Sequence, residues 1–183
     1  DCYATLLWVA ANSQSLGIEP TQIGVGGDSA GGNLAAAVAI KARDTTDVDL
    51  AFQLLIYPCN DNEMNYDSAY NNATGYGLST QAMKWFWEQY LSKKSDAKNP
   101  YAVPAAAKDF SNLAPAIITT AEFDPLLDDG YIYAELLRKS GVQTAYREYE
   151  GMIHGYFSLA GITPDANVLH QHVADEINAL LAR

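Results

Sequence analysis

A serine flanked by glycines carries the clearest chemical signal in this sequence. Ser29 lies in residues 26–32 (GGDSAGG), after a short apolar run and before an alanine-rich stretch. Between a strand and a helix, a G-x-S-x-G pattern places the serine on a strained turn that exposes its hydroxyl. We expect a side chain at Gly27 or Gly31 to clash in so sharp a bend. The helix that begins there offers backbone N–H groups and a dipole, which can stabilise an oxyanion.

Other interpretations of the glycine-rich run account for it less well. A dinucleotide-binding fingerprint counted from Gly24 requires a third glycine at the position of Ser29. No Gly-Lys-Ser/Thr follows, which argues against a phosphate-binding loop. A purely structural glycine turn remains the alternative to a nucleophile.

A histidine is the natural base for such a serine, because its pKa suits proton transfer at neutral pH. His154 lies in residues 151–155 (GMIHG), just after a predicted strand, where a base at the strand ends would be found. The other two histidines, His170 and His172, lie two positions apart on a predicted helix. Their side chains diverge, and we expect them on a solvated face. A structural role for His154 remains the alternative.

The third group must be a carboxylate that orients the imidazole and stabilises its cation. Asp124 is at a turn directly after a predicted strand, whereas Glu122 is still within that strand. Asp128 and Asp129 look like capping residues of the next helix. We therefore predict Ser29, Asp124 and His154 as the catalytic residues. Their order along the chain is the one expected for α/β-hydrolases.

Alternating strands and helices must bring these side chains together. Near-continuous apolar strands separated by helices predict an α/β fold, with a mainly parallel sheet covered by helices on both faces. Strands are predicted at 22–26, 52–57, 116–120 and 144–149. Helices are predicted at 2–15 and 33–43, from Ser79 past Leu91, at 128–140, and from Thr163 to the C-terminal end. Leu34, Val38 and Ala39 are expected core contacts of the second helix.

The chain reads as one domain over residues 1–183, with a loop-helix-loop insertion at 61–115 near the active site. Residues 61–77 are polar and non-periodic, which predicts a long loop. The helix that follows has apolar residues on one face: Met83, Phe86, Trp87, Tyr90 and Leu91. We expect the aromatic helix from Trp85 to Tyr90 to line or cover the acyl pocket, with Trp85 and Phe86 in substrate binding. Ordinary core packing is at least as open an alternative.

Composition limits the partners and the surroundings. The net charge of −11 disfavours nucleic acids, because phosphate binding needs a basic footprint. No apolar run approaches the roughly 18 residues that span a membrane. Cys2 and Cys59 form neither a disulfide framework nor a zinc-ligand spacing, so we expect free thiols, a cytoplasmic location and no metal.

Three stretches make the sequence similar to the hormone-sensitive-lipase-like family of esterases. They are residues 27–35 (GDSAGGNLA), 122–126 (EFDPL) and 154–157 (HGYF), supported by Tyr57-Pro58 and the aromatic helix around Trp85. The resemblance implies hydrolysis of short- to medium-chain carboxylic esters through an acyl-enzyme, with no cofactor. It also implies that the amide of Ala30 is one oxyanion donor.

The departure from this family is at the front of the chain. Members carry a His-Gly-Gly-Gly loop upstream of the nucleophile, and here only His154 is followed by glycine. The chain thus resembles the C-terminal portion of a member. We expect impaired activity, since losing an oxyanion donor slows turnover about 10²–10³-fold. The first strand becomes an exposed edge, which predicts a homo-oligomer.

Two further functions stay open at this point. Some relatives of this family keep the fold, lose the histidine and bind a small ligand without turning it over, whereas His154 is present here. An amidase or peptidase could use the same three side chains. The aromatic helix and the family motifs favour a small-molecule ester as the substrate.

Overall fold

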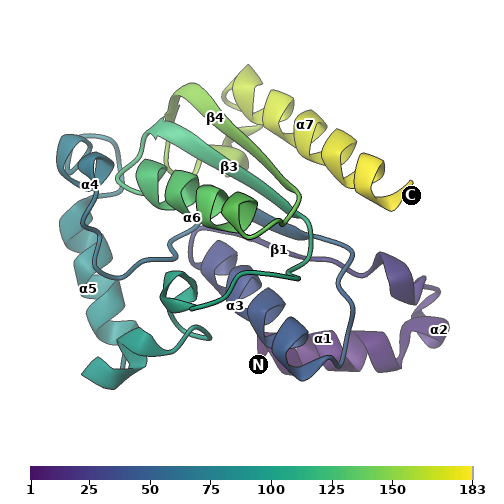
Figure 1. Cartoon of the computed structure of the whole chain (residues 1–183). Helices are drawn as coiled ribbons and strands as arrows, with labels where there is room; N and C mark the ends of the chain where they lie inside the picture. Colours follow the sequence, from purple (N-terminus) through teal and green to yellow (C-terminus); the bar gives the residue numbers. More distant parts are fainter. Residues whose placement is uncertain (183) are drawn as a thin grey trace.

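Four parallel strands form the centre of the molecule. In the computed structural model, which describes residues 1–182, they are β1 (Val25–Asp28), β2 (Gln53–Ile56), β3 (Ala116–Phe123) and β4 (Thr144–Ile153). They pair in the order β1-β2-β3-β4, so strands that follow one another in sequence are neighbours in space (Figure 1). The predicted parallel sheet is confirmed.

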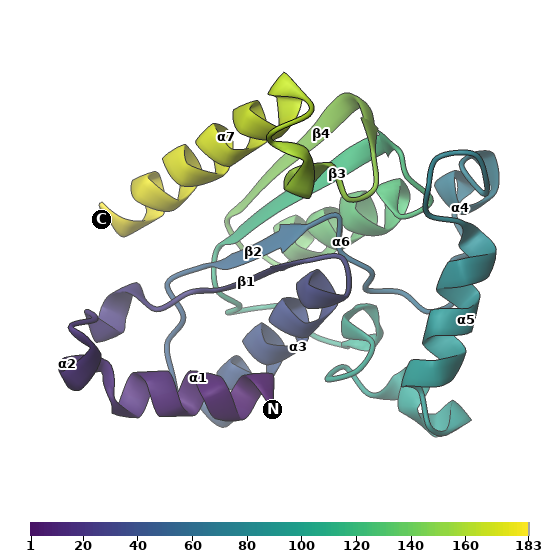
Figure 2. The same cartoon turned by 180° about the vertical axis from the view of Figure 1, so that it is seen from behind.

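Helices cover both faces of this sheet. The α-helices of the described residues are α1 (Cys2–Ala11), α2 (Ser13–Leu16), α3 (Ala30–Thr45), α4 (Asp67–Asn71), α5 (Thr80–Tyr90), α6 (Leu127–Lys139) and α7 (Pro164–Leu181). α3 and α6 pack on one face and α7 on the other, while α4 and α5 lie together beyond one end of the strands (Figures 1 and 2). The α/β class with helices on both faces is therefore confirmed.

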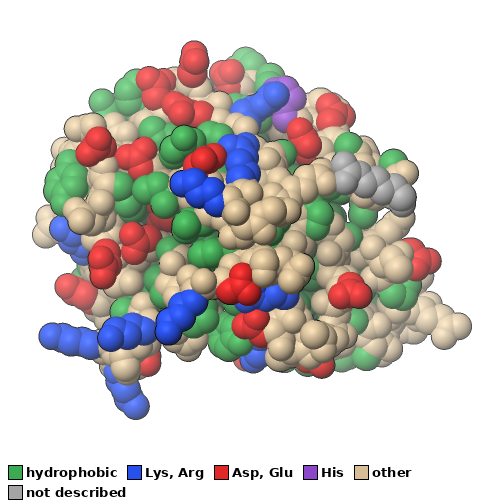
Figure 3. All heavy atoms as spheres, in the orientation of Figure 1, with side chains coloured by type: hydrophobic (Ala, Val, Ile, Leu, Met, Phe, Trp, Pro, Cys, Tyr) green, Lys and Arg blue, Asp and Glu red, His purple; other side chains and the backbone are tan. Residues whose placement is uncertain are grey.

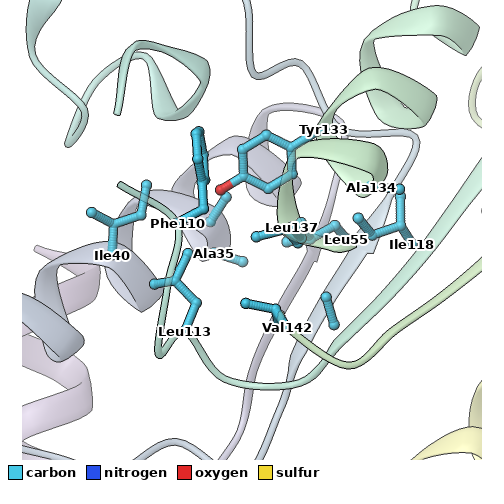
Figure 4. Packing of buried hydrophobic residues seen from close by; sticks show 12 residues of the cluster. Ala35, Ile40, Leu55, Phe110, Leu113, Ile118, Tyr133, Ala134, Leu137 and Val142 are labelled. Atoms are coloured by element: carbon cyan, nitrogen blue, oxygen red, sulfur yellow. The ribbon is translucent and has the colours of Figure 1, made fainter. Parts of the chain in front are cut away.

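The larger core lies between the sheet and the α3–α6 layer (Figure 4). Leu55 of β2 and Ile118 of β3 are fully buried there against Ile40, Tyr133 and Leu137. Burying each such aliphatic side chain contributes about 1.5–3 kcal/mol. The opposite face of the sheet is covered by α7, whose inward residues are Leu169 and Val173. These layers hold the strand ends in fixed positions.

The first strand begins later than predicted. Val25 is the first residue of β1, since its N–H donates to the carbonyl of Phe52, and the strand runs to Asp28. Pro20–Gln22, part of which was predicted as strand, forms a 3-10 turn. Glycines are poor strand formers, so sequence periodicity alone misses the Gly-Gly end of β1.

Other elements also differ from the prediction. The helix predicted at 2–15 is interrupted at Asn12, whose side-chain amide donates to the carbonyl of Trp8. The loop predicted at 61–77 contains the short helix α4. Val38 and Ala39 are buried as expected, but Leu34 is 37% exposed. The prediction of burial fails at Leu34 because its side chain lines an open cavity instead of the core.

Candidate active site

Ser29 occupies a strained turn between β1 and α3. Its φ is 54° and its ψ is −119°, a region that residues with a side chain rarely adopt. A Cβ at Gly27 would lie closer than 3.0 Å to the backbone of Gly31, so only glycine fits there. A Cβ at Gly31 would meet nothing within 4 Å, so the expected clash at that position is wrong. The tight second contact is at Gly32, whose Cβ would lie 3.0 Å from Pro58.

His154 connects the serine to a buried carboxylate. Its Nε2 lies 2.9 Å from Ser29 Oγ, and its Nδ1 lies 2.6 Å from Asp124 Oδ2. Asp124 follows β3 and His154 follows β4, and the carboxyl ends of parallel strands meet at one edge of the sheet. With the Nδ1 proton donated to Asp124, Nε2 is free to accept the Ser29 proton. The structure thus brings the three predicted residues together.

Both oxygens of Asp124 are engaged, and its side chain is fully buried. Oδ1 accepts a 2.9 Å hydrogen bond from the Leu126 N–H, while Oδ2 accepts from His154. Because the two bonds point in different directions, the carboxylate cannot rotate without losing one of them. This arrangement orients the imidazole ring.

The rival carboxylates have other partners. Glu122 lies within β3 as predicted, and its Oε2 accepts a 2.7 Å hydrogen bond from the Gly151 N–H near the end of β4. Asp128 accepts from the Ser68 N–H, and Asp129 accepts from the N–H groups of Asn60 and Asp61.

Asp128 and Asp129 therefore do not cap α6, and that prediction is wrong. The N-cap of α6 is Leu126, and it makes no side-chain capping bond. The two carboxylates instead hold the segment that follows β2. Burial raises the pKa of Asp129 to about 8, which favours its neutral form.

The histidines on α7 contact the rest of the protein, which contradicts the expected solvated face. His170 Nε2 lies 3.0 Å from the Phe157 carbonyl oxygen. His172 lies within hydrogen-bond distance of Arg147 and 3.0 Å from the Tyr149 hydroxyl. Their side chains diverge as expected, but each turns to a different part of the β4 region.

Tyr57, at the end of β2, is a neighbour of His154 that sequence reasoning did not identify. Its ring centroid lies 4.6 Å from that of His154, and the side chain is fully buried. Burial and the nearby Asp28 carboxylate raise the pKa of Tyr57 well above its usual value, so it remains a neutral phenol. The only sequence signal for this residue is its position before Pro58, directly after a strand.

An apolar cavity of about 480 Å³ opens beside Ser29. It is lined by Ser29, Ala30, Asn33, Leu34, Cys59, Leu78, Met83, Phe86, Trp87 and Tyr90. Phe86 is among them, but Trp85 is not: it is 55% exposed and packs edge-on against Phe86. Trp87 and Tyr90 of the same aromatic helix also line the cavity, together with Leu78, which was not expected there.

Ala30 lies where the resemblance requires an oxyanion donor. It is the first residue of α3 and lines the cavity next to Ser29. The first N–H groups of a helix have no intrahelical acceptor, so this amide is available to a ligand.

Several features bear on metals, thiols and membranes. Within residues 1–182, no group of three or more His, Cys, Asp or Glu side chains is arranged to hold a metal ion. Cys2 is exposed and Cys59 is buried, both as free thiols, and burial raises the pKa of Cys59 to about 12. None of the described helices combines the length and apolar character needed to cross a bilayer.

Comparison with known proteins places these observations in a family. Residues 1–158 match the alpha/beta hydrolase fold family. Carboxylesterase NlhH of Mycobacterium tuberculosis is 40% identical over 169 residues, covering 91% of this chain and 53% of that protein. Arylesterase of Saccharolobus solfataricus is 36% identical over 157 residues, covering 85% of this chain and 51% of that protein.

Solved structures agree with the sequence comparison. A thermostable esterase from Pseudomonas putida superposes with a TM-score of 0.94 at 36% identity, covering 98% of this chain and 58% of that one. The thermophilic carboxylesterase EstE1, cloned from a metagenomic library, also gives 0.94 at 36% identity, covering 99% of this chain and 62% of that one. The resemblance to esterases of this fold is confirmed. The chain spans about half the length of the curated relatives it matches.

Proposed function

Because the chain belongs to the alpha/beta hydrolase fold family, we propose that it carries the catalytic residues of a serine carboxylesterase acting on short- to medium-chain esters. The observation that supports this most is the hydrogen-bonded series from Ser29 Oγ through His154 to Asp124, at 2.9 and 2.6 Å. The relatives named carboxylesterase and arylesterase support the same reaction class.

In the first half of the proposed reaction, Ser29 Oγ attacks the ester carbonyl carbon while His154 Nε2 takes the hydroxyl proton. The carbonyl oxygen gains negative charge, and the Ala30 N–H donates to it. His154 then gives its proton to the alkoxide leaving group, and the C–O bond to the alcohol breaks. Asp124 stays ionised and stabilises the imidazolium.

In the second half, water attacks the acyl-enzyme. His154 takes a proton from the water, a second oxyanion forms beside Ala30, and the bond to Ser29 Oγ breaks as the proton returns to it. The products are a carboxylic acid and an enzyme in its starting form.

The apolar cavity accounts for the proposed substrate class. Its lining, including Leu78, Phe86 and Trp87, is almost entirely apolar and begins at Ser29. An acyl chain bound there loses its contact with water at a gain of about 0.8 kcal/mol per buried CH₂. The intact hydrogen bond from Ser29 to His154 favours turnover over ligand binding alone.

Covalent labelling with a fluorophosphonate probe tests the proposal. We expect the chain to label, Ser29→Ala to lose all labelling and His154→Ala to label far more slowly, since the serine then lacks its base. Ser92→Ala, a change at an exposed serine, serves as the matched control and should label like the wild type. Unchanged labelling of Ser29→Ala would contradict the proposed nucleophile.

The proposal includes two properties of this chain taken by itself. Ala30 is one oxyanion donor, and these 183 residues hold no His-Gly-Gly-Gly sequence to supply others, so the isolated chain reacts slowly.

No other strand among residues 1–182 pairs with the outer edge of β1, and this edge is where a second copy pairs to form a homo-oligomer.

A further inference from the structure

The turn that carries Asp124 is held by residues of α4 and its C-terminal end. Asn72, the residue after α4, donates from its side-chain Nδ2 to the carbonyl oxygens of Glu122 at 2.9 Å and Asp124 at 3.2 Å. One amide thus bonds the backbone carbonyl two residues before Asp124 and that of Asp124 itself.

Ser68 holds the other side of the same turn. Its hydroxyl donates to the Pro125 carbonyl oxygen at 3.0 Å and accepts from the Asp128 N–H at 3.0 Å. Its own N–H donates to Asp128 Oδ2 at 2.7 Å. The side chain of Ser68 is 4% exposed, so these bonds are shielded from water.

α4 is itself anchored to the helix that lines the cavity. Thr80, the first residue of α5, donates from Oγ1 to the Ala69 carbonyl oxygen at 2.6 Å and from its N–H to that of Ala73 at 3.1 Å. The turn that carries Asp124 is therefore bonded to α4 and Asn72, and this segment is in turn bonded to the start of α5.

We propose that Asn72 is a positioning residue for Asp124, an inference that rests on the proposed function. Asp124 aims its carboxylate at His154 only while the backbone of the turn keeps its direction, because β3 ends at Phe123 and no ladder bond fixes the turn beyond it. Within the turn, the Leu127 N–H donates to the Asp124 carbonyl at 3.1 Å, and the Asn72 amide adds a constraint from outside the turn. A displacement of about 1 Å in a catalytic group can slow a reaction about 10²-fold.

The test compares Asn72→Ala with Asn71→Ala. Asn71 is the exposed neighbour, so the pair makes the same chemical change at adjacent positions. We expect fluorophosphonate labelling of Ser29 to slow about 10–100-fold in Asn72→Ala and to stay within about twofold of wild type in Asn71→Ala.

A second readout separates positioning from a structural effect. The Nδ1 proton of His154, donated to Asp124, gives a far-downfield signal in one-dimensional proton NMR. We expect that signal to shift or vanish in Asn72→Ala and to persist in Asn71→Ala, at temperatures where far-ultraviolet circular dichroism shows both folded. If the wild type fails to label, the proposed function is wrong, and the NMR comparison still decides the role of Asn72.

If Asn72→Ala does not fold, Asn72→Leu takes its place, since it keeps a side chain of similar size and removes both donated bonds. Wild-type labelling together with an unchanged Nδ1 signal in the folded variant would overturn the proposal.

Discussion

At Ser29 the backbone adopts a φ of 54°, and the residues on either side make that conformation possible. Gly27 leaves room for the carbonyl of Gly31, and the Ser29 N–H donates to Ile56 of β2 at 2.9 Å. The strain of such a backbone costs of order 1–3 kcal/mol, which the surrounding packing must offset. This backbone conformation directs the Ser29 hydroxyl toward the cavity and toward His154.

Alanine at Gly27 should destabilise the fold, whereas alanine at Gly31 should not. The Cβ at Gly27 meets backbone that cannot move aside, and overpacking of this kind costs about 1–3 kcal/mol. Gly31 is a helical position with open space, so Gly31→Ala should be neutral or up to about 1 kcal/mol stabilising. Urea unfolding of both variants measures the difference. Equal stabilities would contradict this account.

Asp129 is the residue whose ionisation should affect stability most visibly. Its carboxyl ionises near 3.8 in ordinary surroundings, and burial raises its pKa to about 8 in the folded protein. Between these pH values the folded state holds a proton that the unfolded chain releases, so this contribution to stability falls as pH rises.

Asp129→Asn removes this ionisation while keeping the shape and one acceptor oxygen. The stability of the variant relative to wild type should therefore increase from about pH 4 to about pH 8, by at most about 1.4 kcal/mol per pH unit. Unfolding by urea at a series of pH values gives the two curves. Parallel curves would show that Asp129 does not titrate in this range.

Among the elements, α5 forms one wall of the cavity, whose other lining residues include Ala30, Asn33 and Leu34 of α3, and a side-chain cap defines the start of α5. Ser79 Oγ accepts from the Ala82 N–H at 3.1 Å, as its position before the helix predicts. Met83 and Trp87 are buried toward the protein, whereas Phe86 and Tyr90 of the same predicted face are half exposed at the cavity. The apolar face of α5 therefore serves both packing and the cavity.

Ser79→Ala should cost about 1 kcal/mol of stability, because the N-cap bond is lost. Ser92→Ala, at an exposed position just after the same helix, should change stability by less than about 0.5 kcal/mol. Thermal or urea unfolding compares the two. A loss of the same size in both would mean that the cap contributes nothing specific.

For the whole molecule, the outer edge of β1 and the spread of charge have opposite effects on association. Acidic and basic side chains are interspersed over the face seen in Figure 3, with several lysines and arginines at its lower left. The net charge of −11 opposes close approach of two copies. The unpaired β1 edge favours it, and main-chain hydrogen bonds are not screened in the same way.

We expect the purified chain to associate increasingly with concentration, as measured by sedimentation velocity. Val25 and Ser29 donate their N–H groups to β2, so the alternation along the ladder directs the Gly26 N–H outward. Gly26→Pro removes that donor and should weaken association. A wild-type chain that remains monomeric at every concentration would contradict edge pairing.

The isolated chain should hydrolyse p-nitrophenyl butyrate about 10²–10³-fold more slowly than the full-length Pseudomonas putida esterase it resembles. The expected reason is that this chain supplies fewer oxyanion donors, since the Ala30 N–H is the one donor that we propose for it. A comparable kcat for the two proteins would contradict this reason.

Local sequence determined most of the elements and the identity of the side chains proposed to react. The glycines around Ser29, the turn at Asp124 and the loop at His154 each follow from short-range rules that act within a few residues. The parallel sheet also follows from sequence, because apolar strands alternate with helices. The exact start of β1 and the helix α4 did not follow, since the Val25 N–H bonds to Phe52 and the Ser68 N–H in α4 bonds to Asp128, both far along the chain.

Only the tertiary structure decided which groups meet. Asp128 and Asp129 have the sequence signature of helix caps, yet they bond Ser68, Asn60 and Asp61, about sixty residues away. Tyr57 beside His154 and Asn72 beneath Asp124 likewise depend on how distant segments pack, which no local pattern encodes. Propensity and spacing act along the chain, whereas burial and hydrogen-bond partners are settled by the fold as a whole.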